Sequence, residues 1–192
     1  MLNPDRASVI LDIGGGSPKT GVGFFSSLLS TVAQKMIIMD PNIHPAAIAP
    51  ANIEFVRSPA DYDSVKALLA SHPEITHIAS ISVFEHVHYP VREGIIKAIN
   101  ETFRGHTFVA TFEYHASTEY LAYGLTARTL SNLFKPMTNF YPDRIASSPF
   151  LGETSYEKCR IFRFRFNNLR QMFGKSNIPR WYPVVVRFIR MA

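Results

Sequence analysis

The feature that most constrains the fold is an apolar run that stops at three consecutive glycines near the start of the chain. Residues 7–13 are almost continuously apolar, which is typical of a strand buried on both faces, and Gly14, Gly15 and Gly16 follow directly. Glycine has no Cβ and tolerates positive φ, so the backbone of this turn can approach a ligand closely. A helix over residues 21–32 and a second apolar run, residues 35–40, complete a unit of strand, turn, helix and strand.

The same alternation continues through the first two thirds of the chain. Further strands are predicted at residues 53–57, 76–82 and 106–114, with helices at residues 61–71 and 91–103 between them. Strands that alternate with helices in this way pair in parallel through right-handed crossovers. The sequence therefore predicts an α/β fold, a Rossmann-like three-layer sandwich with a mostly parallel sheet.

The alternation of predicted strands and helices ends at residue 118. We expect a helix over residues 119–134 and then a loop punctuated by Pro136, Pro142 and Pro149. Residues 158–167 alternate phenylalanine with arginine, and residues 183–191 form a last apolar run. Alternation with one basic face predicts an antiparallel strand at the C-terminal end of the sheet.

Composition narrows the class of protein. The 192 residues contain no Pro/Gly/Ser-rich linker, so we expect a single domain over residues 1–192. No apolar stretch is long enough to predict a membrane span, and the N-terminus does not resemble a secretory signal. The single cysteine, Cys159, cannot form an internal disulfide, which favours a cytoplasmic location. Histidine and cysteine spacing predicts no metal site.

Three nucleotide-binding interpretations of the glycine turn compete. The spacing from Gly16 to Gly21 is followed by Val22 and Gly23 rather than Lys and Ser/Thr, which excludes a P-loop. A dinucleotide fingerprint would place its third glycine where Lys19 stands. Asp40 nevertheless ends the second strand where a ribose-binding acid belongs, so an NAD-type oxidoreductase stays open.

The third interpretation is a resemblance. Asp12, Gly14 and Gly16 match the first positions of motif I of class I S-adenosylmethionine-dependent methyltransferases, D-x-G-x-G-x-G, with Pro18 at the last position. Asp40 stands where that family has its ribose-binding acid. "SISVFEHV", residues 80–87, resembles the motif that follows strand four in small-molecule methyltransferases. The matches span about residues 8–115.

The resemblance implies S-adenosyl-L-methionine as cofactor and assigns a set of binding residues. The glycine turn would lie against the amino-carboxypropyl group, Asp40 would bind the ribose hydroxyls, and Ser80 or Ser82 would lie near the methionine carboxylate. The implied cofactor-binding residues are Asp12, Gly14, Gly15, Gly16, Asp40, Asp61, Ser80 and Ser82.

Two histidines are the candidate catalytic residues. His86 follows strand four, and a neutral imidazole there could accept a proton from a substrate oxygen or nitrogen. His115 ends strand five, where alternation points it the same way as Glu113. The sequence thus predicts a methyltransferase that acts on a small-molecule acceptor, with a catalytically silent binding or regulatory protein of the same fold as the alternative.

Charge is distributed unevenly. The net charge is +5, but residues 1–157 carry 11 Lys/Arg and 15 Asp/Glu, while residues 158–192 carry 9 Lys/Arg and no acid. A basic segment attracts anionic partners, such as a phosphorylated metabolite, RNA or an acidic protein surface. Motifs of DNA-modifying methyltransferases are absent, which argues against a DNA substrate. Arginines within the expected C-terminal strands are candidates for an oligomer interface.

Overall fold

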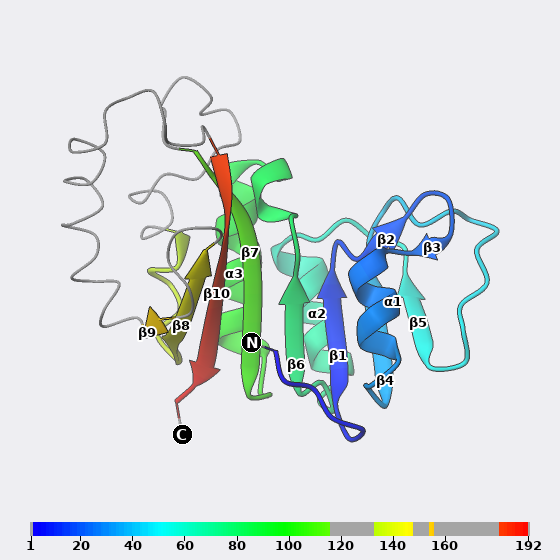
Figure 1. Cartoon of the computed structure of the whole chain (residues 1–192), viewed down its shortest axis with the longest axis horizontal. Coiled ribbons are helices and arrows are strands. Elements are labelled where there is room, and N and C mark those ends of the chain that lie inside the picture. Colours follow the sequence, from blue (N-terminus) through cyan, green and yellow to red (C-terminus); the bar gives the residue numbers. More distant parts are fainter. Residues whose placement is uncertain (1, 116–132, 148–153, 156–180, 192) are drawn as a thin grey trace.

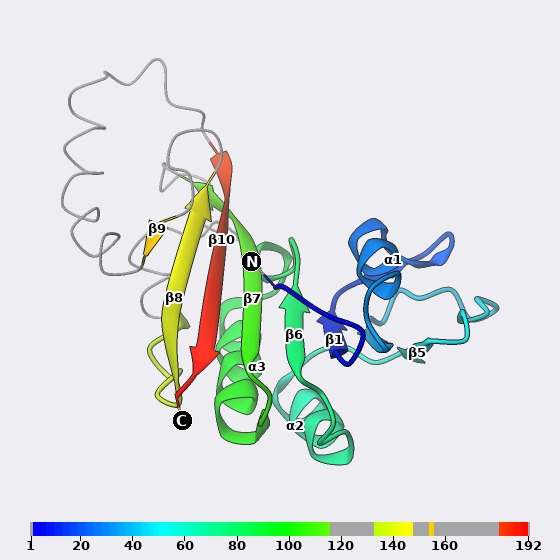
Figure 2. The ribbon, with the colours of Figure 1, turned by 60° about the horizontal axis from the view of Figure 1, so that its bottom comes forward.

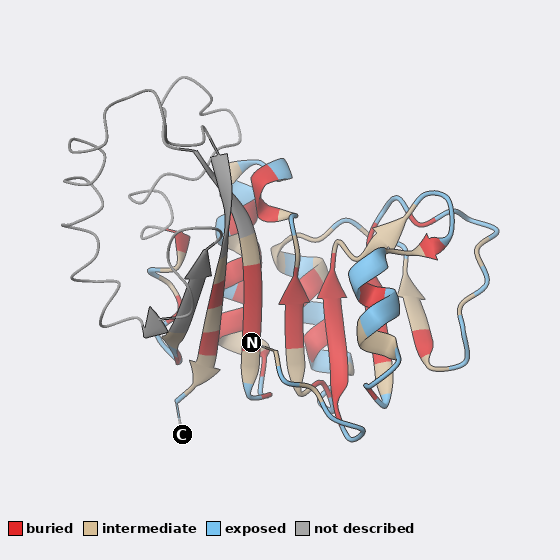
Figure 3. Ribbon diagram, viewed as in Figure 1, coloured by how far each residue is buried: buried red, intermediate tan, exposed pale blue. Residues whose placement is uncertain are grey.

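The centre of the fold is a strand with no exposed residue. The computed structural model describes residues 2–115, 133–147, 154–155 and 181–191. In it, β1 (Val9–Ile13) is buried at all five positions. It pairs in parallel with β4 (Lys35–Met39) on one side and with β6 (His77–Ser80) on the other. The continuous apolar run is thus explained by its central place in the sheet (Figure 3).

Around β1 the described residues form a sheet of eight strands in the order β5-β4-β1-β6-β7-β10-β8-β9 (Figure 1). The remaining strands are β5 (Ile53–Val56), β7 (Thr107–His115), β8 (Phe140–Ser147), β9 (Thr154–Ser155) and β10 (Trp181–Arg190). The first five strands of that order are parallel, and β10 is antiparallel to both β7 and β8. The predicted Rossmann-like sheet with an antiparallel C-terminal strand is confirmed.

Helices cover both faces of the sheet. α2 (Tyr62–Ser71) and α3 (Tyr89–Thr102) lie on one face, and α1 (Phe24–Ser30) lies on the other (Figure 2). The larger apolar cluster is packed between the sheet and α2 and α3, and a smaller one lies under α1. Phe108 of β7 stacks on Phe188 of β10 at 5.7 Å between ring centroids, which joins the antiparallel strand to the core.

The helix expected over residues 21–32 is shorter than predicted. Residues before it form a small hairpin of β2 (Gly16–Ser17) and β3 (Gly21–Val22), and Gly21 has a φ of +79°. An added Cβ at Gly21 would lie 2.7 Å from the Cβ of Ala47. The hairpin therefore uses the glycines that follow the turn, and α1 can begin only at Phe24.

The loop predicted through the prolines is wrong at its centre, because residues 140–147 form β8. Pro142 lies opposite Phe188, where the register between β8 and β10 shifts. A proline has no N–H to donate, and it is tolerated beside a bulge and near a sheet edge. The expected strand at residues 158–167, and all but the end of the helix expected over residues 119–134, lie outside the described residues.

Two arginines of β10 are bound within the fold. Arg187 forms an ion pair with Asp143 of β8, and its side chain is 11% exposed. Arg190 donates to the carbonyl of Phe103 and lies over the ring of Phe140 at 5.6 Å. Their guanidinium groups thus have partners within the chain, and an oligomer interface through the strand arginines stays a prediction. The other arginines of the basic segment, residues 158–180, lie outside the described residues.

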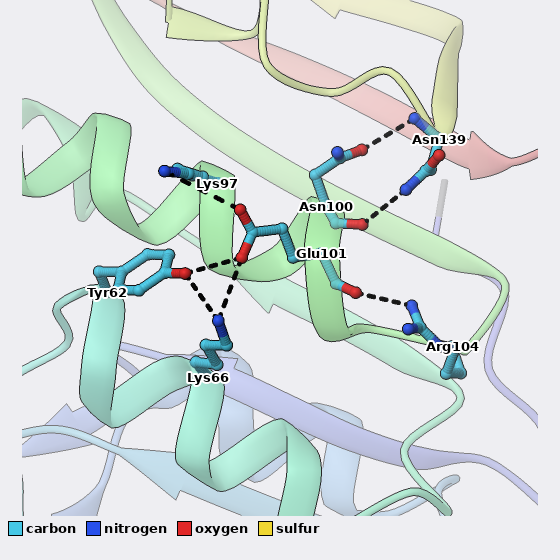
Figure 4. A network of polar contacts seen from close by, with 7 residues as sticks. All are labelled: Tyr62, Lys66, Lys97, Asn100, Glu101, Arg104 and Asn139. Atoms are coloured by element: carbon cyan, nitrogen blue, oxygen red, sulfur yellow. Dashed lines mark hydrogen bonds and ion pairs between the residues drawn. The ribbon is translucent and has the colours of Figure 1, made fainter.

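Polar contacts join α3 to its neighbours (Figure 4). On the α2 side, the Tyr62 hydroxyl donates to Glu101 at 2.7 Å and accepts from Lys66 at 2.7 Å. On the β8 side, Asn100 Oδ1 accepts from the backbone N–H of Asn139 at 2.8 Å. The carbonyl of Asn100 in turn accepts from the Asn139 side chain at 2.9 Å. Asn100 thus positions the chain as it enters β8.

We expect Asn100→Ala to lower the free energy of unfolding by about 1–3 kcal/mol. Asn100 is buried, and its removal leaves the backbone N–H of Asn139 without this acceptor. Lys97→Ala on the same helix is the control, because that exposed lysine lies 3.9 Å from Glu101 and should change stability by less than about 0.5 kcal/mol. Urea unfolding measures both variants, and equal effects would contradict the role of Asn100.

Candidate functional site

The turn between β1 and β2 lies at the carboxyl edge of the parallel strands. Gly14 has a φ of +80°, and its N–H donates to the carbonyl of Met39 at the end of β4. An added Cβ at Gly14 would lie 2.2 Å from a methyl carbon of Val83. Both the backbone conformation and the lack of space therefore require glycine at this position.

Gly15 is equally confined, by two polar side chains. An added Cβ would lie 2.3 Å from Asp12 Oδ2 and 2.4 Å from Ser26 Oγ. Asp12 is the fourth residue of β1 and Ser26 is the buried serine of α1. The Ser26 hydroxyl of α1 thus contacts the Asp12 carboxyl group of β1, the strand that precedes the turn.

The contacts of Asp12 are compatible with a protonated carboxyl group. The Ser26 hydroxyl lies 2.6 Å from Asp12 Oδ2 and 2.8 Å from the carbonyl of Gly15, yet it has one proton to donate. Burial raises the pKa of Asp12 to about 7; the hydrogen bond from Ser26 opposes the rise, and the charge of Asp40 adds to it. A protonated Asp12 can donate to Ser26 while Ser26 donates to Gly15. Asp12 Oδ1, also buried, has no hydrogen-bond partner among the described residues.

Asp40 is held by backbone amides on both of its oxygens. It follows β4 directly, is 8% exposed, and accepts from the N–H of Gly16 at Oδ2 (3.1 Å) and from the N–H of Asn42 at Oδ1 (2.8 Å). Each carboxylate oxygen can accept two hydrogen bonds, so each keeps one acceptor position. This geometry suits two neighbouring hydroxyl groups of one ligand.

The segment after β6 packs against the glycine turn through Val83. Ser80 is fully buried, and its hydroxyl has no partner within the described chain. Ser82 has a φ of +54°, uncommon for a residue with a Cβ, and its N–H donates to Thr111 Oγ1 at 2.8 Å. His86 ends a single 3₁₀ turn, Phe84–His86, and its side chain is exposed.

The two buried polar atoms lie on opposite faces of the sheet. Asp12 faces α1, since Ser26 contacts it there. Ser80 has the same orientation as Ile78, which belongs to the cluster under α2 and α3. A ligand that satisfies both must cross the carboxyl edge of the sheet.

Two further expected site residues, Asp61 and His115, lie at the start of α2 and at the end of β7. Asp61 caps α2: its Oδ1 accepts from the N–H and hydroxyl of Ser64, and Ser64 in turn accepts from the N–H of Asp61. His115 ends β7, five residues beyond Ala110, which pairs with Ser80. At about 3.3 Å per residue, its backbone lies about 16 Å further along the strand than the end of β6.

Sequence reasoning missed Ser26 and Thr111, which hold the site together from α1 and β7. Ser26 stands in the first turn of the helix that follows the glycines, where a side chain reaches back toward the turn. That position is a readable signal. Thr111 carries no such signal, because its contact with Ser82 depends on the register of β6 and β7.

Two cavities open at the amino edge of the sheet. One, of about 620 Å³, is lined by residues that include Lys35, Asn52, Glu54 and Glu74. The other, of about 230 Å³, lies between the C-terminal ends of α2 and α3. Within residues 2–115, 133–147, 154–155 and 181–191, no three His, Cys, Asp or Glu side chains group as metal ligands would. No helix in those ranges has the length and apolarity of a membrane span.

The raised pKa of Asp12 predicts a pH dependence of stability. The folded chain binds this proton more tightly than the unfolded chain does, so stability from Asp12 is present below pH 4 and is lost as the pH rises toward 7. Asp12→Asn stays neutral and should lack this loss. Relative to the wild type, its free energy of unfolding should rise by roughly 2–3 kcal/mol between pH 5 and pH 8 in urea titrations. A difference that is the same at both pH values would contradict a neutral Asp12.

Comparison with known proteins gives likeness in fold alone. No protein-family model and no curated protein sequence matches the chain. A phosphoethanolamine N-methyltransferase 2 of Haemonchus contortus, solved with S-adenosyl-L-methionine, is 11% identical with a TM-score of 0.58 over 100% of this chain and 50% of that one. The chain thus spans about half the length of that protein.

Two further solved structures show the same arrangement. A magnesium protoporphyrin IX methyltransferase of Synechocystis PCC 6803 with bound S-adenosylmethionine is 11% identical with a TM-score of 0.59, covering 98% of this chain and 71% of that one. A cyclopropane synthase of Mycobacterium tuberculosis is 9% identical with a TM-score of 0.62, covering 98% and 80%. The chain therefore has the fold of the class I S-adenosylmethionine-dependent methyltransferases.

Proposed function

We propose that this chain binds S-adenosyl-L-methionine at the carboxyl edge of β1, β4 and β6 and transfers its methyl group to a small-molecule acceptor. The observation that carries the proposal is the meeting of the glycine turn with Asp40. Gly16 donates its N–H to the same carboxylate that keeps one acceptor position free on each oxygen. The fold of solved methyltransferases, some with this cofactor bound, supports the choice of ligand.

The residues of the edge fit the parts of this cofactor. Asp40 would accept from the two ribose hydroxyls. The bare backbone of Gly14 and Gly15 would lie against the amino-carboxypropyl group, whose ammonium suits the buried Oδ1 of Asp12. On the other face of the sheet, the hydroxyl of Ser80 and the N–H groups after β6 would face its carboxylate.

Methyl transfer needs alignment more than strong acid or base chemistry. The bound cofactor supplies a methyl carbon on a sulfonium, which an acceptor lone pair takes as the carbon–sulfur bond breaks. Because the leaving group is good, holding the acceptor in line supplies much of the rate. His86, exposed at the end of the 3₁₀ turn that follows Val83, would take the proton that the acceptor loses, and His115 is the second candidate, further along β7.

Cofactor binding without transfer is the second candidate function. The hairpin of β2 and β3, with Pro18 between its strands, stands where motif I has its last glycine. An added Cβ at Gly16 would lie 2.6 Å from the Cβ of Asp40, so this hairpin begins tight against the proposed ribose site. An acceptor assay on a protein that binds the cofactor separates the two functions.

We expect Asp40→Ala to weaken binding of S-adenosylmethionine by about 1.5–3 kcal/mol, or roughly 10- to 150-fold in Kd, because two hydrogen bonds to a charged group are lost. Titration calorimetry with the cofactor, and separately with NAD, measures this on the full chain. Asp63→Ala is the control, since that acid is exposed in the first turn of α2. Unchanged affinity in Asp40→Ala would remove Asp40 from the site, and binding of NAD instead would support the oxidoreductase.

His86→Ala should leave the Kd of the cofactor within about twofold and lower methyl transfer at saturating cofactor by about 10²-fold or more if the imidazole acts as base. Transfer of a radiolabelled methyl group to a panel of small alcohols, amines and phosphorylated metabolites provides the assay. An unchanged rate would mean that alignment alone drives the reaction. A large loss of cofactor affinity would instead place His86 in the binding site.

A further inference from the structure

A buried arginine on α3 contacts the segment that carries His86. Arg92 is 2% exposed and lies in the first turn of α3. Its guanidinium turns back toward the chain that precedes the helix. Nε donates to the carbonyl of Val87, and Nη2 lies 3.5 Å from the carbonyl of Glu85. These two carbonyls belong to the residues on either side of His86.

Burial of this cation is costly, so its contacts must compensate it. Burial lowers the pKa of Arg92, while the negative charge of Glu85, itself 3% exposed, opposes that shift. Arginine nevertheless stays protonated in proteins, and a buried charge is stable only when it is paired and hydrogen-bonded. Buried polar contacts of this kind add less to stability than an apolar side chain of the same size, and in some proteins they fix one conformation.

The segment that Arg92 holds forms part of the candidate site. Val83, at its start, packs on Gly14, and Phe84 is fully buried against Phe108 at 6.4 Å between ring centroids. Phe84 anchors the segment by apolar packing. The polar contacts of Arg92 act on the carbonyls of Glu85 and Val87, the residues on either side of His86.

We propose that Arg92 is a positioning residue, which fixes the backbone on both sides of His86 and thereby sets where this imidazole stands relative to the glycine turn. Its importance for methyl transfer rests on the proposed function. Its effect on the conformation of residues 83–87 does not, and the two parts can be tested separately.

The first test is hydrogen exchange of the amides of His86 and Val87, which donate to Val83 and Phe84 within the 3₁₀ turn. In Arg92→Met, which keeps the apolar stem but removes the charge, these two amides should exchange at least about tenfold faster relative to those of Ile95–Ile99 in α3. Arg92→Lys keeps the charge and should restore part of the protection. Arg104→Met is the matched control, since Arg104 also donates to a backbone carbonyl, that of Glu101, but is exposed.

The second test is calorimetric titration of the same variants with S-adenosylmethionine. We expect Arg92→Met to weaken binding by about tenfold, Arg92→Lys by less, and Arg104→Met not at all. Equal acceleration of all amides in Arg92→Met, or no acceleration at His86 and Val87, would overturn the proposal. If Arg92→Met does not fold, Arg92→Lys decides the question. Its His86 and Val87 amides should then exchange faster than in the wild type, relative to those of Ile95–Ile99, and no such acceleration would overturn the proposal. A wild-type chain that binds no cofactor would refute the proposed function, while the exchange result would still decide whether Arg92 positions His86.

Discussion

The site depends on one constraint: the chain between β1 and α1 must pass between two carboxylates, Asp12 and Asp40, without any side chain of its own at the closest points. Strand order creates the constraint, because β1 and β4 are neighbours and both end at the carboxyl edge. Gly15 leaves room for Asp12 and Ser26, and Gly16 leaves room for Asp40. A single added methyl group at either position would collide with a carboxylate or the carbon that bears it. The glycines are therefore required by the protein itself, even before a ligand is considered.

Asp12 and Asp40 are both buried beside this turn, but their surroundings differ. Asp40 accepts two backbone N–H groups. Asp12, enclosed by the sheet and α1, has one serine hydroxyl and a pKa of about 7. Asp40 can thus accept hydrogen bonds from a ligand, whereas Asp12 stays close to neutral until a cationic group approaches it. This division suits a ligand with a diol at one end and an ammonium group at the other.

Much of the fold and part of the site could be predicted from the sequence. The five parallel strands were predictable because each is a short apolar run bounded by turns, and the position of Asp40 at the end of β4 was predictable because it ends such a run. β8 was not predicted because Pro142 indicates a loop. The bulge that accommodates this proline depends on pairing with β10. Contacts between distant segments could not be predicted, because they arise from tertiary packing and leave no pattern in the sequence. They include Val83 with Gly14, Thr111 with Ser82, and Arg92 with the carbonyls beside His86. For Asp61, the sequence could not distinguish a helix cap from a ligand contact, and the structure supplies the cap.

The proposed cofactor site lies at the carboxyl edge of the sheet, whereas the cavity of about 620 Å³ opens at the amino edge. Backbone amide NMR of the labelled chain, titrated with S-adenosylhomocysteine, the product form of the cofactor, tests this most directly. We expect the largest chemical-shift changes at Gly14, Gly15 and Gly16 and in the segment from Ser80 to Val83. Shift changes centred instead on Asn52, Glu54 and Glu74, or none at saturating ligand, would contradict it.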